Sequence, residues 1–441
     1  MLNRLKKLIL LAGDLLFLHL ALLFTLCLRY GQENVYIYFQ NHWSHFIFVF
    51  IVWLLVSYIN NFYNLDLKIN NRRFWRALIN TAVSSGLIST LYFYLNVNSD
   101  IAPKTNLAIF IVVFTILFLI WRYLYQAITH SLLPKGHLAI IGNNERTNRI
   151  IAEIQDSPSF EYQIGRIYKS SLELEHLASH IRKEHIKAVV IVDDFGNDEK
   201  IRQLLFDCLK YKITFFSYPD LYELLTGKIP VEAIGPKWFL SNLKEGNRNY
   251  FNALKRVTDF FLALFIFAVT LPFWPLIAIL IKLSSPGPVF FTQMRLGLNA
   301  QAFRIIKFRT MKEDGNDLSS TKPGDKRITK FGLFIRKTRI DEIPQVLNIL
   351  RNEMSFIGPR PERLDMAVDL EKNIPFYRTR LLIKPGLTGW DQISGKYHSP
   401  SLEDSLEKLQ YDLYYLKHRS LYLDLSITLK TIATILSRSG N

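Results

Sequence analysis

Four apolar segments, each long enough to cross a lipid bilayer, occupy the first third of this 441-residue chain; they lie at about 8–28, 43–60, 77–97 and 105–128. The hydrocarbon core of a bilayer is roughly 30 Å thick, so a spanning helix needs about 20 apolar residues. The first segment is too long for the apolar core of a secretory signal, and no small-residue cleavage site follows it. The sequence therefore predicts a bundle of four membrane-spanning helices over residues 1–130.

Basic residues are distributed unevenly around these segments. The stretches 29–42 and 98–104 carry few of them, whereas a group precedes the first segment and another separates the second from the third. The residues of these two groups are Arg4, Lys6, Lys7, Lys68, Arg72, Arg73 and Arg76. By the positive-inside rule, both ends of the bundle face the cytoplasm of a bacterial-type inner membrane.

Two ionisable residues, Asp14 and His19, lie inside the first apolar segment. An ionisable residue within a membrane is a functional candidate by default. Asp14 is close to the basic end of the segment and can simply reach the interface, so a structural role is favoured for both. The two cysteines, Cys27 and Cys208, fall in an apolar segment and in a predicted cytosolic domain, and no disulfide is expected.

The pattern changes from about residue 136, where short apolar runs alternate with helical stretches. This alternation predicts a cytosolic, Rossmann-like α/β module with a parallel sheet over residues 136–248. Its first strand ends at Gly142, where a dinucleotide-binding loop needs G-x-G-x-x-G, and only the first glycine is present. Without the second glycine the backbone cannot approach a pyrophosphate closely. A regulatory, oligomerising or structural role is therefore favoured over a cofactor site.

A fifth apolar segment, 257–283, contains Pro272 and Pro275 in its middle and is flanked by basic residues on both sides. Proline inside a helix removes a hydrogen bond and clashes with the preceding turn. These features predict a re-entrant helix, broken at Pro272, that returns to the side from which it entered. The alternative is a kinked fifth span, which would place residues 284–441 outside the cytoplasm.

The last third carries an adjacent acidic pair, Asp341 and Glu342, directly before a predicted helix whose first position suits Pro344. Two neighbouring carboxylates repel one another unless a cation lies beside them, and Mg²⁺ is the natural one near phosphates. Arginines supply the positive charge that phosphate oxygens require, and these are Arg336, Arg339 and Arg360. The arrangement indicates a phosphoryl-transfer site in which a carboxylate attacks phosphorus. An acidic pair at a helix start is, alternatively, only a good cap.

The chain has 54 Lys and Arg against 38 Asp and Glu, a net charge of +16. Such an excess suits nucleic acid, an anionic membrane face or a phosphate-rich substrate. No zinc finger or RNP-type aromatic motif is present, so nucleic acid is not an expected partner.

A series of ordered motifs carries a resemblance to a known family. They read KR..D before the re-entrant helix, then SPGPVFFTQMRLG, FRIIKFRTM, RKTRIDEIPQ.LNIL, MSFIGPRPE, KPGLTGW and QYDLYYLKHRSLYLDLSI. Residues 254–441 closely resemble the bacterial sugar transferase family, the monotopic phosphoglycosyl transferases. The whole architecture is similar to the long, exopolysaccharide-initiating members of the undecaprenyl-phosphate glucose or galactose phosphotransferase type. The resemblance implies a mostly α-helical catalytic domain over 254–441.

The same resemblance implies an activity. A sugar-1-phosphate passes from a UDP-sugar to polyprenyl (undecaprenyl) phosphate and UMP is released, as the first membrane step in assembling an exopolysaccharide, capsule or O-antigen-type glycan. Asp341 takes the position of the nucleophile that forms a covalent phosphosugar intermediate. Glu342 takes that of a magnesium ligand or helper, so that the pair would hold Mg²⁺.

The resemblance also implies roles for residues outside the acidic pair. Arg336 matches a phosphate-binding arginine and Arg360 an arginine near the nucleotide. Lys307 and Arg309 match a motif that is structural or phosphate-facing, and Pro272 matches the residue that breaks the re-entrant helix.

Two positions depart from the family pattern. Arg339 stands where a serine or small residue is common, and Asp391 stands where alanine is common, in a loop expected to border the sugar. The donor sugar, the polysaccharide and the oligomeric state are therefore left open. Residues 402–438 suit helices on the membrane surface or, equally, helices packed on the catalytic domain. The rival functions are a catalytically silent membrane scaffold and a membrane-anchored nicotinamide oxidoreductase.

Overall fold

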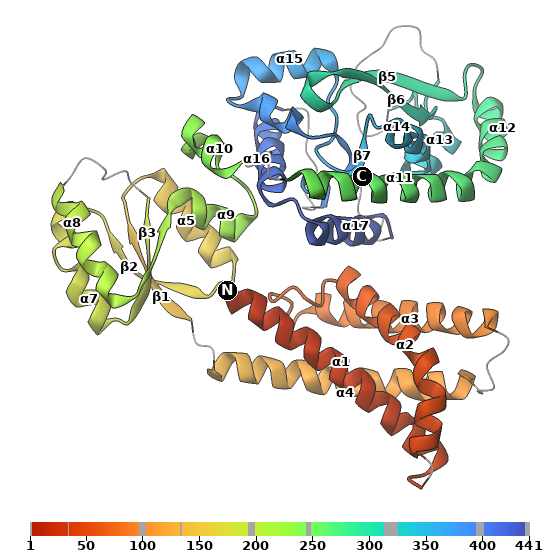
Figure 1. Cartoon of the computed structure of the whole chain (residues 1–441), viewed down its shortest axis with the longest axis horizontal. Coiled ribbons are helices and arrows are strands. Elements are labelled where there is room, and N and C mark those ends of the chain that lie inside the picture. Colours follow the sequence, from red (N-terminus) through yellow and green to blue (C-terminus); the bar gives the residue numbers. More distant parts are fainter. Residues whose placement is uncertain are drawn as a thin grey trace. The chain divides into compact units, whose positions relative to one another are not determined.

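The computed structural model describes residues 2–33, 35–96, 103–132, 135–192, 199–243, 248–312, 325–393 and 401–436. The chain divides into two compact units, Met1–Leu221 and Tyr222–Asn441. The first unit contains a helical bundle and an α/β module, and the second is mostly helical (Figure 1).

The bundle has the four helices that the apolar segments predict, and each is longer than its apolar segment. They are α1 (Leu2–Tyr30), α2 (Val35–Ile59), α3 (Arg72–Leu95) and α4 (Pro103–Leu132). All four are long and apolar enough to cross a membrane. Aromatic rings fill the core, where Trp53 packs edge-on against Phe114 at 4.7 Å. Gly13 lets α1 approach α4 closely, because a Cβ there would lie 2.0 Å from the indole of Trp121.

Asp14 is buried in the bundle, with 2% of its surface exposed. It forms an ion pair of 2.7 Å with Arg122 of α4, and the Arg122 guanidinium lies 4.4 Å from the ring centroid of Phe118. The ion-pair partner comes from another helix 108 residues away, which supports the structural role that the sequence favours for Asp14. His19 contacts the carbonyl of Leu15 at 2.6 Å through Nδ1.

The α/β module confirms the predicted parallel sheet. Its strand order is β2-β1-β3-β4, with β1 (Gly136–Ile141), β2 (Tyr162–Tyr168), β3 (Ile186–Ile191) and β4 (Thr214–Ser217). Figure 1 shows α5 (Glu145–Asp156) on one face of the sheet and α7 (Leu177–Lys183) and α8 (Glu199–Cys208) on the other. In α5, the Asn144 side chain accepts a hydrogen bond from the Thr147 backbone N–H, and the Thr147 side chain accepts from the Asn144 N–H, a capping box. Cys27 and Cys208 are both free thiols.

The second unit begins with the predicted broken helix. Helix α11 (Asn249–Thr270) is followed by a 3₁₀ segment (Leu271–Phe273) and by α12 (Trp274–Ser284). Pro272 lies in the 3₁₀ segment, and the chain changes direction there (Figure 1). Trp274 holds the turn by packing edge-on against Phe308 at 5.4 Å.

The rest of the unit consists of short helices and two small two-stranded sheets. The antiparallel pair is β5 (Phe290–Leu296) with β6 (Ala302–Phe308), and the parallel pair is β7 (Ser355–Ile357) with β8 (Gly386–Thr388). Helix α10 (Pro236–Asn242) precedes the broken helix, and the α-helices after it are α13 (Lys330–Lys337), α14 (Val346–Leu350), α15 (Leu364–Asn373), α16 (Leu402–His418) and α17 (Leu421–Leu436).

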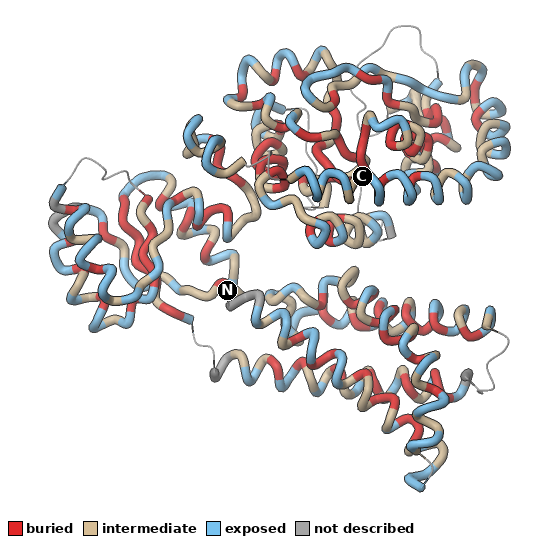
Figure 2. Tube along the Cα trace, viewed as in Figure 1, coloured by how far each residue is buried: buried red, intermediate tan, exposed pale blue. Residues whose placement is uncertain are grey.

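Helix α17 packs on the core of the second unit, as one of the two expectations for the C-terminal stretch holds, and its position on a membrane surface stays a prediction. Leu423 and Ile427 are buried in the domain core, whereas Tyr422 is 69% and Leu425 is 56% exposed. One face of α17 therefore packs on the domain and the other is exposed, and Figure 2 shows buried and exposed positions along the same helix.

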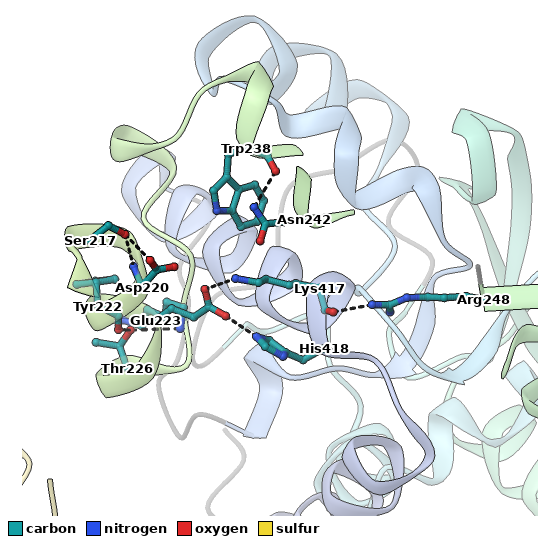
Figure 3. A network of polar contacts seen from close by, with 11 residues as sticks. Ser217, Asp220, Tyr222, Glu223, Thr226, Trp238, Asn242, Arg248, Lys417 and His418 are labelled. Carbon is teal, nitrogen blue, oxygen red and sulfur yellow. Dashed lines mark hydrogen bonds and ion pairs between the residues drawn. The ribbon is translucent and has the colours of Figure 1, made fainter. Parts of the chain in front are cut away.

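Residues 222–243, which the alternation pattern assigns to the middle module, pack on the second unit. Ile229 and Val231 are buried in the same hydrophobic cluster as helix α16. Glu223 accepts a hydrogen bond of 2.7 Å from Lys417 and also contacts His418 (Figure 3). We call residues 222–243 the linker strap.

Candidate active site

The acidic pair lies upstream of an α-helix, as predicted, but within a 3₁₀ helix, η6 (Ile340–Gln345), that leads directly into α14. Arg339, in the left-handed conformation with φ 57°, separates η6 from α13. The α-helix starts only at Val346, because Pro344 lacks an N–H and disfavours α-helix in the turn before it. Asp341 and Glu342 are each 8% exposed.

Glu342 is held by two cations from separate elements. Its Oε1 accepts hydrogen bonds from Lys307 Nζ of β6 at 2.6 Å and from Arg360 Nη2 at 2.9 Å. Burial opposes ionisation of Glu342, but the charges of Lys307 and Arg360 outweigh it and hold the pKa of this carboxyl well below its usual range. Burial lowers the pKa of Lys307, and the charge of Glu342 opposes that shift. Glu342 is therefore ionised, and its Oε1 is bound by Lys307 and Arg360.

Asp341 has different surroundings from its neighbour. Its Oδ1 is buried and has no hydrogen-bond partner among the residues that the structure describes. Burial and the adjacent negative charge of Glu342 raise the pKa of Asp341 to about 6, against the opposing charges of Lys307, Arg339 and Arg336. The pair thus consists of one carboxylate fixed by cations and one with an unbonded oxygen.

Arg336 lies in the last turn of α13, where its Nε donates to Thr310 Oγ1 at 2.8 Å. Burial lowers its pKa, and the charge of Asp341 opposes this. The side chain is fixed at Nε close enough to Asp341 for their charges to interact. Gly332 allows this placement, because a Cβ there would lie 2.0 Å from the Thr310 carbonyl oxygen.

Arg309 contacts neither member of the acidic pair in any described interaction. Its Nη1 donates to the Pro286 carbonyl at 2.9 Å and its Nη2 to the Ser285 carbonyl at 2.7 Å. It therefore holds the turn that follows α12, as the structural alternative for the K-F-R motif expects. A phosphate-facing role for Arg309 stays a prediction.

Arg360 lies in the turn after β7. Three glycines, Gly358, Gly386 and Gly389, let this turn pack closely against β8 and the residues that follow it. A Cβ on Gly386 would lie 2.1 Å from the Gly358 nitrogen, and one on Gly389 would lie 2.6 Å from the Gly358 oxygen. The Glu342 carboxylate raises the pKa of Arg360, and Asp391 adds to this effect. Asp391 is 3% exposed, so the unusual carboxylate of this loop lies in the charged network around Arg360.

Sequence reasoning missed the buried charges behind Arg360. Arg380 and Asp412 are 3% and 2% exposed and form an ion pair of 2.8 Å. Both lie within the motifs that carry the resemblance or next to them, but a linear pattern does not show that an arginine and an aspartate 32 positions apart meet.

The fold and the site together define a membrane protein whose last domain surrounds a buried acidic pair with cations suited to phosphate. Residues 250–438 match the family model "Bacterial sugar transferase". The chain belongs to the bacterial sugar transferase family.

Several curated relatives support this membership. A UDP-glucose:undecaprenyl-phosphate glucose-1-phosphate transferase of Xanthomonas campestris pv. campestris is 35% identical over 274 residues, which is 60% of this chain and 56% of the relative. A UDP-N-acetylgalactosamine-undecaprenyl-phosphate N-acetylgalactosaminephosphotransferase of Aeromonas hydrophila is 35% identical over 262 residues, 59% of this chain and 60% of the relative. An exopolysaccharide production protein of Rhizobium leguminosarum bv. phaseoli is 38% identical over 192 residues, 42% of this chain and 96% of the relative. The chain thus spans less than two thirds of the length of the first two relatives.

Proposed function

We propose that this protein transfers a sugar-1-phosphate from a UDP-sugar to polyprenyl phosphate and releases UMP, which begins the assembly of an exopolysaccharide or similar glycan. Two relatives with this kind of name are each 35% identical to the chain. Their names differ in the sugar, glucose in one and N-acetylgalactosamine in the other, so the donor sugar stays open.

The unequal surroundings of the acidic pair carry the proposal. Glu342 is bound by Lys307 and Arg360, whereas Oδ1 of Asp341 has no described hydrogen-bond partner. An ionised carboxylate that spends no lone pair on a hydrogen bond is available as a nucleophile. A helix cap would instead accept a hydrogen bond from a backbone N–H.

In the first half-reaction, an Asp341 oxygen attacks the phosphorus that carries the sugar. The phosphorus–oxygen bond to UMP breaks, and UMP leaves with the bonding electron pair. In the second, an oxygen of polyprenyl phosphate attacks the same phosphorus, and its bond to Asp341 breaks, which restores the carboxylate. Lys307, Arg336 and Arg360 supply fixed positive charge for the phosphoryl group throughout.

The donor set fits Mg²⁺ shared with a substrate. This ion is usually held by one or two carboxylates together with phosphate oxygens and waters. Asp341 and Glu342 would supply the carboxylates. The described part of the chain contains no group of three or more His, Cys, Asp or Glu side chains able to enclose a metal. When bound, Mg²⁺ would neutralise charge on the diphosphate.

We also infer that α11 and α12 enter the cytoplasmic face of a bacterial inner membrane and return to it. Near one end of the broken helix, Arg256 donates to the carbonyls of Ile349 and Leu350. Near the other end, Ile281 is 2% exposed and packs in a cluster with Phe308 and Ile335 of the same domain. The stretch between presents exposed apolar side chains, including Phe261, Phe265, Val269, Phe273 and Leu276. A helix that spans the membrane would put its ends on opposite faces, roughly 30 Å apart.

Mass spectrometry of the enzyme incubated with a UDP-sugar and Mg²⁺, without acceptor, tests the chemistry. We expect a peptide containing Asp341 to gain the mass of a sugar phosphate and to lose it when polyprenyl phosphate is added. Asp341→Asn should give no adduct and a turnover lower by orders of magnitude, whereas Asp369→Asn, on the exposed face of α15, should behave as wild type. Sequential kinetics together with an active Asp341→Asn enzyme would mean that the acidic pair only caps a helix. If the enzyme releases no UMP from any UDP-sugar, the catalytically silent scaffold is favoured instead.

A further inference from the structure

The turn that carries Arg360 is held at four consecutive backbone carbonyls. Pro359 O accepts from the Gly386 N–H at 2.9 Å, and Arg360 O from Arg380 Nη2 at 3.0 Å. Pro361 O accepts from Arg295 Nη1 at 3.2 Å, and Glu362 O from the Leu296 N–H at 3.1 Å. The donors come from β5, β8 and the 3₁₀ helix Tyr377–Leu382. We call Arg295 and Arg380 the carbonyl clamp.

Arg380 is the more deeply embedded member of the clamp. It is 3% exposed, and it also donates to the Tyr377 hydroxyl at 2.6 Å. Asp412 at 2.8 Å and Glu362 at 3.6 Å balance its charge. Burying a guanidinium costs several kcal/mol of desolvation unless it is paired and fully hydrogen-bonded. A turn needs no such group merely to reverse the chain.

The carbonyl clamp binds the backbone of the residue whose side chain binds Glu342, which is Arg360, and of the next residue, Pro361. The Arg360 side chain is 38% exposed at its surface, yet it meets Glu342 Oε1 at 2.9 Å. An arginine side chain loses conformational entropy when its guanidinium is held in one position. This loss is smaller if the backbone at its Cα is already fixed. Interactions that hold a binding residue's backbone therefore increase the affinity that its head can supply.

We propose that Arg380, together with Arg295, is a positioning residue that pre-organises Arg360 for the phosphate or nucleotide part of the donor. In this proposal the two clamp residues act on the substrate only through Arg360. This inference rests on the proposed function, because it assigns Arg360 to donor binding.

A double-mutant cycle on the full-length enzyme in detergent tests the clamp, with UMP as the binding probe. Arg380→Gln should weaken UMP binding and raise the KM for the UDP-sugar by roughly tenfold, the scale of one hydrogen bond to a charged group, with a smaller change in kcat. Arg360→Gln should have an effect at least as large. The double variant should lose little more than Arg360→Gln alone, because both changes remove the same interaction. Arg378→Gln, an exposed arginine of the same 3₁₀ helix whose side chain is 74% accessible, is the matched control and should leave UMP binding unchanged.

The melting temperature of each variant separates positioning from folding. If Arg380→Gln does not fold, Tyr377→Phe and Arg295→Lys make milder changes to the same clamp and should raise the KM for the donor by a few-fold. Additive losses in the double-mutant cycle, or lower stability with UMP affinity unchanged, would overturn the proposal. A wild-type enzyme that neither binds UMP nor releases it would contradict the proposed function instead.

Discussion

Asp341 and Glu342 are adjacent in the sequence but differ in their electrostatic surroundings. The pKa of Glu342 is lowered because Lys307 and Arg360 outweigh its burial, whereas burial and Glu342 raise the pKa of Asp341 to about 6. An aspartate in an unfolded chain has a pKa of about 3.9. The native state therefore holds a proton on Asp341 more tightly than the unfolded state does, so stability is lost as the pH rises from about 4 to about 6 and stays lower above that range.

Replacing Asp341 by Asn should therefore stabilise the protein at alkaline pH while it abolishes turnover. We expect the free energy of unfolding to rise by about 2 kcal/mol at pH 8, because a change of one in the pKa corresponds to about 1.4 kcal/mol and solvent screens part of this energy. The gain should shrink as the pH falls from 6 to 4, since Asp341 is then protonated in the wild-type protein. Melting curves of both proteins in EDTA, without donor, measure the difference. An equal difference at pH 5 and pH 8 would contradict the raised pKa.

The activity should fall at acid pH with a midpoint near the pKa of Asp341, because in the proposed mechanism only the ionised carboxylate attacks phosphorus. Glu342→Gln removes the negative neighbour and leaves Lys307 and Arg360 free to attract the Asp341 charge. The midpoint of the acid limb of kcat/KM should therefore move to lower pH, together with a fall in turnover. A midpoint that stays in place would mean that another group limits the rate in acid.

At the scale of secondary-structure elements, the broken helix determines on which side the catalytic domain lies. Asn249→Cys and Ser284→Cys mark its two ends, and both should react with a membrane-impermeant thiol reagent from the cytoplasmic face only. Pro272→Ala restores a backbone donor at the break and should increase labelling of Ser284→Cys from the opposite face. The increase should be partial, because Trp274 and Ile281 also hold the turn by packing. If either cysteine variant that keeps Pro272 is labelled at its introduced cysteine from the outer face, re-entry is refuted.

The pair of Asp14 and Arg122 joins α1 to α4 in the membrane bundle. Asp14→Asn leaves the Arg122 charge buried without its partner, which costs about 3 kcal/mol or more. We expect lower thermal stability and greater sensitivity to proteases. Changing Asp14 to Leu and Arg122 to Met together removes both charges and should recover most of the loss. If the double variant is as unstable as Asp14→Asn, the stability comes from hydrogen bonds and packing that the pair makes with its other neighbours.

At the scale of the whole molecule, the linker strap decides where a functional catalytic fragment begins. Ile229 is 0% and Val231 is 3% exposed within the core of the second unit, and Lys228 pairs with Glu407. A fragment that starts at Tyr218 keeps these contacts, and one that starts at Asn249 loses them. Burial of two such side chains is worth about 3–6 kcal/mol. We expect UMP release from the longer fragment in detergent, and aggregation or a much lower melting temperature from the shorter. If the two fragments have equal melting temperatures, the linker strap does not contribute to the stability of the catalytic domain.

The sequence by itself determined the features that depend on local pattern. Hydropathy over about 20 residues predicts four spans, and the alternation of strands and helices predicts a parallel sheet. The break at Pro272 follows from the chemistry of proline. Family motifs named Asp341, Glu342, Arg336, Arg360, Lys307 and Arg309 as site residues, because each motif is a short, contiguous run.

The tertiary structure alone decided what these residues do to one another. Lys307 and Arg360 lie 35 and 18 positions from Glu342, yet both bind its Oε1. They leave an oxygen of Asp341 without a described partner. Arg309 turns instead to carbonyls more than 20 positions away, and Arg380 reaches the Arg360 carbonyl with Asp412 balancing its charge. Burial and Coulomb interaction depend on distance in space, which spacing along the chain does not encode, so only the fold distinguishes the carboxylate held by cations from the one with an unbonded oxygen.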